Sequence, residues 1–125
     1  MRAILLIGTV ALLALSPFSL IADESVAPSW IDVSAILNNR CVMCHSAVAG
    51  ASKGLRLDKY QAALAGSDSG AVLIPGDVGG SELIRRLRGE SKPRMPFLSR
   101  PLPDTEIDLI ERWIAAGLPE FVMTD

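Results

Sequence analysis

Apolar side chains recur at helical spacing in three stretches of this 125-residue chain. Apolar residues that return every three to four positions give a helix one face that packs against a core. The pattern predicts a helix starting at Trp30 with Ser29 as N-cap, a helix capped by Ser81, and a last helix capped by Asp104 and ended by Gly117. The apolar faces are formed by Ile31, Val33, Ile36, Leu37 and Cys41; by Leu83, Ile84 and Leu87; and by Ile107, Leu109, Ile110, Trp113 and Ile114.

The remaining segments predict one short helix and irregular loops. Asp58 and Gln61 have the spacing of a capping box for a helix from 59 to 65, which Gly66 would end. Residues 89–103 contain four prolines and are predicted to be irregular. In the helix after Ser81, the basic residues Arg85, Arg86 and Arg88 are expected to face water. The predicted fold class is therefore all-α, with short helices joined by loops.

The first 22 residues have the pattern of a secretory signal peptide. The run from Ala3 to Ala22 contains twenty residues and no charge, as signal peptides do, and cleavage fits after Ala22 or after Ala27. Because twenty uncharged residues could just span a bilayer, an uncleaved membrane anchor is the alternative. In both cases residues 23–125 are predicted to form one exported domain, located in the periplasm.

The segment Cys41-Val42-Met43-Cys44-His45 contains both cysteines and the one histidine of the chain. Two cysteines separated by two residues and followed by histidine form the attachment signature of c-type haem. On a helix these three side chains would share one face, because they are three and four residues apart. Both sulfurs could then bond to the two vinyl groups of one haem, and His45 could ligate its iron. The motif predicts one haem c, covalently held by Cys41 and Cys44.

Two other uses of the cysteines are weaker. A structural disulfide across so short a loop would remove little chain entropy, so it would stabilise the fold little. A thiol–disulfide exchange protein would need a thioredoxin-like βαβ pattern, which the sequence lacks. A zinc site would need a second pair of cysteines or histidines. A haem-free thiol–disulfide protein is kept as the less favoured alternative.

Met95 is predicted to be the second axial ligand of the iron. His45 is the only histidine, so a second histidine within the chain is excluded. Among the methionines, Met1 would leave with the signal, Met43 is confined to the proximal side, and Met123 lies near the end of the chain. Met95 lies in the proline-rich loop, fifty residues after His45. A thioether ligand favours ferrous iron and completes the coordination, which suits one-electron transfer.

Charge is unevenly distributed along the chain. Residues 23–125 contain 11 basic and 14 acidic residues, a balance that gives no support for nucleic-acid binding. Residues 81–100 contain six basic and two acidic residues, net +4, whereas the rest of residues 23–125 is net −7. A basic rim near a haem edge would speed docking to an acidic redox partner. The alternative is an ordinary solvated helix face, with one arginine neutralising a haem propionate.

The chain resembles the planctomycete-type cytochrome c domain, within the class I c-type cytochromes. The resemblance extends over nearly all of residues 33–118. It rests on segments 36–45, 54–58, 70–77, 81–86, 94–96, 103–107 and 113–117. It implies a small helical haem fold in which the first and last helices pack together. It also implies Cys41 and Cys44 as attachment points, His45 as proximal ligand and Met95 as distal ligand.

Two features depart from the family pattern. The usual Met-Pro-Pro is here Met95-Pro96-Phe97, which alters the loop after the ligand. Family members are often fused to large further domains, whereas this sequence ends at Asp125. A fused relative need not diffuse freely, so it stays open whether this chain is a carrier or a subunit of a larger oxidoreductase.

The predicted function is therefore an exported monohaem cytochrome that carries single electrons between redox partner proteins and catalyses no reaction itself. The main alternative is a haem enzyme or sensor with an open iron site, which would require that Met95 does not ligate. The N-terminal segment could in addition tether the protein to a membrane.

Overall fold

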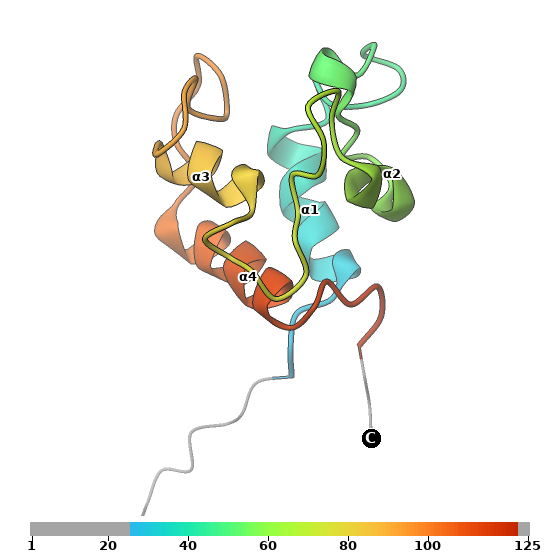
Figure 1. Cartoon of the computed structure of the whole chain (residues 1–125), viewed down its shortest axis with the longest axis vertical. Helices are drawn as coiled ribbons and strands as arrows, with labels where there is room; N and C mark the ends of the chain where they lie inside the picture. Colours follow the sequence, from blue (N-terminus) through green and yellow to red (C-terminus); the bar gives the residue numbers. More distant parts are fainter. Residues whose placement is uncertain (1–25, 123–125) are drawn as a thin grey trace, which may run out of the picture.

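The computed structural model describes residues 26–122, which contain four α-helices and no strand. The helices are α1 (Trp30–Arg40), α2 (Tyr60–Ala65), α3 (Glu82–Arg88) and α4 (Asp104–Ala115), and a 3-10 turn, η1, covers Ser52–Gly54. Long irregular segments connect them, and the loop after α3 lies at the end of the molecule opposite the two ends of the described chain (Figure 1). The predicted all-α fold class is confirmed.

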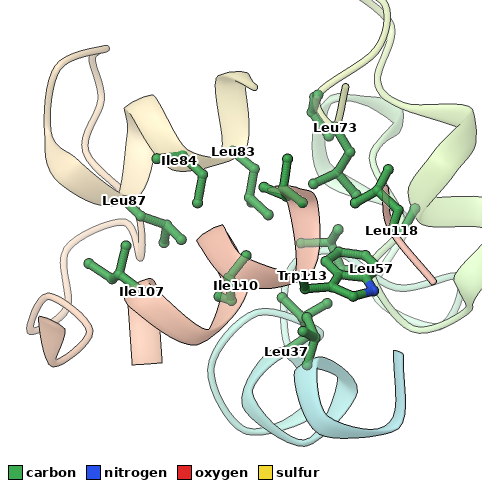
Figure 2. Close-up of a cluster of buried hydrophobic side chains, with 14 of the residues drawn as sticks. Leu37, Leu57, Leu73, Leu83, Ile84, Leu87, Ile107, Ile110, Trp113 and Leu118 are labelled. Atoms are coloured by element: carbon green, nitrogen blue, oxygen red, sulfur yellow. The ribbon is translucent and has the colours of Figure 1, made fainter. Parts of the chain in front are cut away.

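Helix α4 is the centre of the core, and both α1 and α3 pack against it. Leu37 reaches α4 from one side, and Leu83 and Leu87 reach it from the other (Figure 2). Trp113 is completely buried at this junction. Burial of a side chain of this kind is worth roughly 1.5–3 kcal/mol, so the amphipathic face of α4 holds the other helices in place. The expected packing of the first helix against the last is present.

The segment after α4 closes the core around two tryptophans. The carbonyl of Pro119 accepts hydrogen bonds from the Trp30 backbone (3.0 Å) and from Nε1 of Trp113 (2.9 Å). The hydroxyl of Tyr60 donates to the carbonyl of Leu118 at 2.7 Å. These bonds join the start of α1, the start of α2 and the end of α4, so the two ends of the domain stabilise each other.

Helix starts agree with the sequence in part. Ser29 is the N-cap of α1, as predicted, and the Asp32 carboxylate accepts hydrogen bonds from its backbone N–H and its hydroxyl. These bonds lower the pKa of Asp32. Helix α4 begins at Asp104, one residue earlier than expected, with Pro103 as N-cap.

The predicted capping box at Asp58 is wrong. Helix α2 begins at Tyr60, and its N-cap is Lys59. The Asp58 carboxylate instead pairs with Arg56, at 3.2 Å for both contacts, and also accepts a bond from the Ala47 backbone. The hydrogen bonds from Arg56 lower the pKa of Asp58. The Asp58 carboxylate, which was expected to cap the helix, therefore pairs with the Arg56 guanidinium.

Two predicted orientations are also wrong. Ile31 is 66% exposed, because α1 directs Val33 and Leu37 at the core. Arg88 does not simply face water: its guanidinium pairs with three carboxylates of α4 at 2.7–3.0 Å. The three partners are Asp104, Asp108 and Glu111. Arg88 therefore links α3 to α4.

The predicted signal peptide, residues 1–22, lies outside the described residues. Within residues 26–122, none of the helices has the length and apolar character that crossing a membrane requires.

Candidate haem site

One large cavity brings together all four side chains that the sequence singled out. Cys41, Cys44, His45 and Met95 line it, and its volume is about 1080 Å³. This is slightly above the roughly 300–1,000 Å³ that cofactor and ligand pockets usually occupy. The apolar part of the wall includes Leu55, Leu57, Val72, Leu83, Pro93, Pro96 and Phe97. The cavity can therefore take a large and mostly apolar molecule.

The cysteine–histidine motif lies in a turn rather than on a helix. Helix α1 ends at Arg40, and Cys41 has non-helical dihedral angles, φ −126° and ψ −39°. The backbone N–H groups of Cys44 and His45 nevertheless both donate to the Cys41 carbonyl, at 3.2 and 3.0 Å. These are the three- and four-residue bonds of a helical turn. This single helical turn therefore places Cys41, Cys44 and His45 at the spacing that was predicted for a helix.

Both cysteines are free thiols, and they differ in exposure. Cys41 is half-buried and packs against the core, whereas Cys44 is exposed. Burial raises the pKa of Cys41 to about 11; among the smaller effects, the charge of Arg40 lowers the pKa and that of Glu106 raises it. Cys41 also follows the C-terminus of α1, where the helix dipole disfavours a thiolate. Neither feature is typical of a reactive cysteine in thiol–disulfide exchange, whose pKa is lowered.

The ring of His45 is oriented by a backbone carbonyl. Nδ1 of His45 lies 3.1 Å from the carbonyl oxygen of Ser52, so the Nδ1–H tautomer can donate there and leave Nε2 free. The Ser52 peptide is itself anchored, since its N–H donates to the Cys44 carbonyl at 3.0 Å. No sequence signal pointed to Ser52, because the turn that presents it is set by the left-handed residues Ala51 (φ 47°) and Lys53 (φ 58°).

Met95 is held by the end of α3. Its backbone N–H donates to the carbonyl of Arg86 at 3.0 Å, and Nε of Arg94 donates to the carbonyl of Leu87 at 3.2 Å. The side chain of Met95 is half-buried and packs against the core. Prolines prevent a helix in this loop, and hydrogen bonds to the end of α3 fix its position instead. Met95 therefore reaches the cavity from the α3 side, and His45 from the segment after α1.

Basic side chains predominate among the charged residues of the cavity wall. The lining contains the basic residues Arg40, Lys53, Arg85, Arg86 and Lys92 and the acidic residues Asp68 and Glu82. Glu82 is paired with Arg86 at 2.6 Å and with Arg85 at 3.5 Å. The predicted basic rim thus reaches the cavity in part, while Arg88 is directed at α4.

Glu82 gives the wall a predicted pH dependence. Hydrogen bonds from Arg86 and Ser91 lower its pKa below the ordinary value for glutamate. The Glu82 carboxylate thus binds a proton less tightly in the folded state than in the unfolded state, so the charged carboxylate stabilises the fold. This stabilisation is fully present above the pKa of the unfolded state and is lost as the pH falls through the pKa of the folded state. We expect the free energy of unfolding to decrease below about pH 4, and less steeply in Glu82→Gln. Denaturant titrations at several pH values measure this. The exposed Glu90→Gln is the control, and an identical slope in both variants would contradict the role of Glu82.

No group of three or more His, Cys, Asp or Glu side chains that could hold a metal ion is present within residues 26–122. The sequence singled out Cys41, Cys44, His45 and Met95, which all line the cavity, but it missed Ser52 and the apolar wall from Leu55, Leu57 and Val72. These three residues lie outside the predicted helices, and nothing in the neighbouring sequence shows that they face a common cavity.

Comparison with known proteins agrees with the resemblance seen in the sequence. The family model described as Planctomycete cytochrome C matches residues 41–96, from the first cysteine of the motif to the proline after Met95. Neither the search of curated proteins nor the search of solved structures found a match. The resemblance predicted from the sequence is confirmed over the matched segment.

Proposed function

We propose that this chain, which carries a planctomycete-type cytochrome c segment at residues 41–96, is an exported monohaem c-type cytochrome that transfers single electrons. The family match supports a c-type cytochrome and a role in electron transfer. The cavity supports the further proposal of one haem with His45 and Met95 as its ligands. The observation that carries it is that both side chains line one cavity together with the two cysteines.

The residues of the cavity fit a haem. Two free thiols stand at the spacing that thioether attachment needs, and the Ser52 carbonyl leaves Nε2 of His45 available for iron. When bound, the haem supplies an iron that alternates between the ferrous and ferric states. Cys41 and Cys44 would hold its edge, while the basic side chains Arg40, Lys53, Arg85, Arg86 and Lys92 can neutralise its two propionates.

The protein's own part in electron transfer is to fix the ligands and to exclude competing ligands. His45 is oriented by a carbonyl that is itself hydrogen-bonded, so its ring would be held in place as a ligand of the iron. Met95 is neutral and soft, and it would raise the reduction potential. If His45 and Met95 both held the iron, oxygen or peroxide would have no site at which to bind it. For this reason we propose a carrier or an electron-transfer subunit rather than an enzyme.

A redox titration of the purified protein tests this proposal. We expect a single one-electron couple per chain and, in the oxidised form, the weak methionine-to-iron band at about 695 nm. The reduced protein should bind carbon monoxide slowly or not at all. Rapid carbon monoxide binding together with absence of the band would favour the alternative, a sensor or enzyme with an open iron site.

We also propose export to the periplasm, on the basis of the uncharged run from Ala3 to Ala22. The mass of the mature protein locates its first residue. A mass that corresponds to a chain starting at Asp23 or Pro28 supports cleavage of the signal peptide. A membrane-bound chain with the mass of the uncleaved sequence supports the anchor.

A further inference from the structure

The loop that carries Met95 is attached to the rest of the domain mainly through α3. Within the described residues, the hydrogen bonds that leave residues 91–100 go to α3, with one exception. The N–H of Met95 donates to the carbonyl of Arg86 at 3.0 Å, and the Arg86 side chain donates to the carbonyl of Pro93 at 3.3 Å. Helix α3 thus fixes the part of the loop that leads to Met95. We call residues 91–100 the distal loop.

The exception comes from α1. A terminal nitrogen of Arg40, the last residue of α1, donates to the carbonyl of Arg100 at 2.5 Å, although the two residues are 60 positions apart in sequence. A cation in the last turn of a helix is favourable wherever its side chain points, because it lies near the negative end of the helix dipole. The bond to Arg100 is additional to that effect, and it joins α1 directly to the distal loop.

The two partners of this bond stand next to the residues proposed to hold the haem. Arg40 lines the cavity and directly precedes Cys41, the first proposed attachment point. Arg100 follows the turn of residues 96–99, which comes directly after Met95. The segment from Met95 to Arg100 is therefore held at its first residue by α3 and at its last residue by Arg40. Loss of the second contact would let the turn move away from α1.

We propose that Arg40 is a positioning residue for Met95, because its bond to the Arg100 carbonyl holds the distal loop against the segment that attaches the haem. The proposal rests on the proposed function, in which Met95 is the distal ligand of the iron. A guanidinium suits this task, since it is always charged and makes strong, charge-assisted hydrogen bonds. The consequence is a slower departure of Met95 from the iron, because the loop must release this bond before it opens.

The charge of Arg40 has a second use that must be separated from this contact. A guanidinium has five N–H groups, so the bond to Arg100 leaves others for a haem propionate. Arg85 is an exposed cation that also lines the cavity, but its side chain pairs with Glu82 of its own helix, at 3.5 Å. Arg40→Met and Arg85→Met each remove one positive charge from the cavity wall. Only Arg40→Met also removes a side-chain contact with the distal loop.

Ligand exchange at the iron of the purified holoprotein measures how firmly Met95 is held. When the oxidised protein is mixed with increasing imidazole, the binding rate should level off at the rate at which Met95 leaves the iron. We expect this limiting rate to rise about tenfold in Arg40→Met and to stay within about twofold of the wild type in Arg85→Met. Both variants should share the effect of the lost charge, a lower reduction potential.

Arg100→Ala is the control for the acceptor. It removes the exposed side chain of Arg100 but keeps the backbone carbonyl that accepts the bond. Its limiting rate should therefore equal that of the wild type. If Arg40→Met yields no folded holoprotein, Arg40→Lys takes its place. This variant keeps the charge on a shorter side chain, and we expect a smaller rise of about threefold. Wild-type behaviour of Arg40→Lys would show that Arg40 supplies charge rather than contact, which overturns the proposal.

Hydrogen–deuterium exchange of the same holoproteins tests the contact without relying on the iron. In Arg40→Met, the amides of residues 94–100 should exchange about tenfold faster than in the wild type, whereas those of α4 should keep their rate. A purely structural role would accelerate exchange in α4 as well, because the whole domain would then open more often. That result, unchanged exchange in residues 94–100, or equal acceleration in Arg85→Met would overturn the positioning role.

The two measurements keep the positioning role separate from the proposed function. If imidazole binds the wild type without a limiting rate while Arg40→Met still accelerates exchange in the distal loop, the hold on the loop is supported and ligation by Met95 is refuted. If the wild type shows a limiting rate that the Arg40 variants do not change, ligation by Met95 stands and the positioning role is refuted.

Discussion

Replacing both Cys41 and Cys44 with serine is expected to abolish covalent haem attachment. In the wild type, co-produced with a haem-maturation system, the mature chain should be about 616 Da heavier than its sequence. In Cys41→Ser/Cys44→Ser that difference should vanish, because no sulfur is left to bond to the vinyl groups. Intact-protein mass spectrometry under denaturing conditions measures this directly, since non-covalent haem is lost there.

The single variants sharpen the result. Cys41 packs against the core and Cys44 is exposed, so Cys41→Ser should also perturb the fold, whereas Cys44→Ser should perturb it little. Each single variant keeps one thiol and can keep one bond to haem. Ser34→Ala, at a half-buried position on α1, is a control that should retain the full mass increase. A wild-type chain that matches its sequence mass and is colourless would refute the haem assignment.

The pKa of Cys41 bears on the alternative of a thiol–disulfide exchange protein. With its pKa raised to about 11, only about one Cys41 thiol in ten thousand is ionised at pH 7. Such a thiol attacks disulfides slowly, since the thiolate is the nucleophile. Haem attachment, by contrast, needs thiols that stay reduced until the cofactor arrives. The environment of Cys41 therefore favours attachment over exchange.

How much of the site was predictable depends on how local each interaction is. The haem motif is local: Cys41, Cys44 and His45 depend on a single turn, so their spacing alone predicts their use. Met95 could be reached by elimination, because the chain has one histidine and few methionines. The carbonyl that faces His45 could not, because it depends on the left-handed backbone on either side of Ser52, and such conformations leave little trace in sequence.

The errors in the fold have the same physical origin. Asp58 had the spacing of a helix cap, but Arg56 lies two residues away and takes its carboxylate. Arg88 seemed to belong to a solvated face, but α3 lies against the acidic side of α4, whose carboxylates are 16 to 23 residues away in sequence. Apolar periodicity identified the helices. Which polar groups would pair depended on contacts that form only after the helices pack.

Replacing Met95 with leucine is expected to remove the distal ligand while keeping most of the packing. Met95 is half-buried against the core, and exchange of methionine for leucine in such a position usually costs less than about 1.5 kcal/mol. We expect the band at about 695 nm to disappear from the oxidised protein and the reduction potential to fall by on the order of 0.1 V or more. Optical spectra and a redox titration measure both effects.

Met43→Leu distinguishes loss of the ligand from loss of any thioether near the haem. Met43 also lines the cavity, but it is 88% exposed and lies between Cys41 and Cys44, so its sulfur is confined to their side. Its variant should keep the band and the potential. Met95→Leu should also begin to bind carbon monoxide rapidly in the reduced state, because the sixth position is then open. A Met95→Leu protein with the spectrum and potential of the wild type would show that another group completes the coordination. In that case the arrangement of the 89–103 loop around Met95 would serve packing rather than electron transfer.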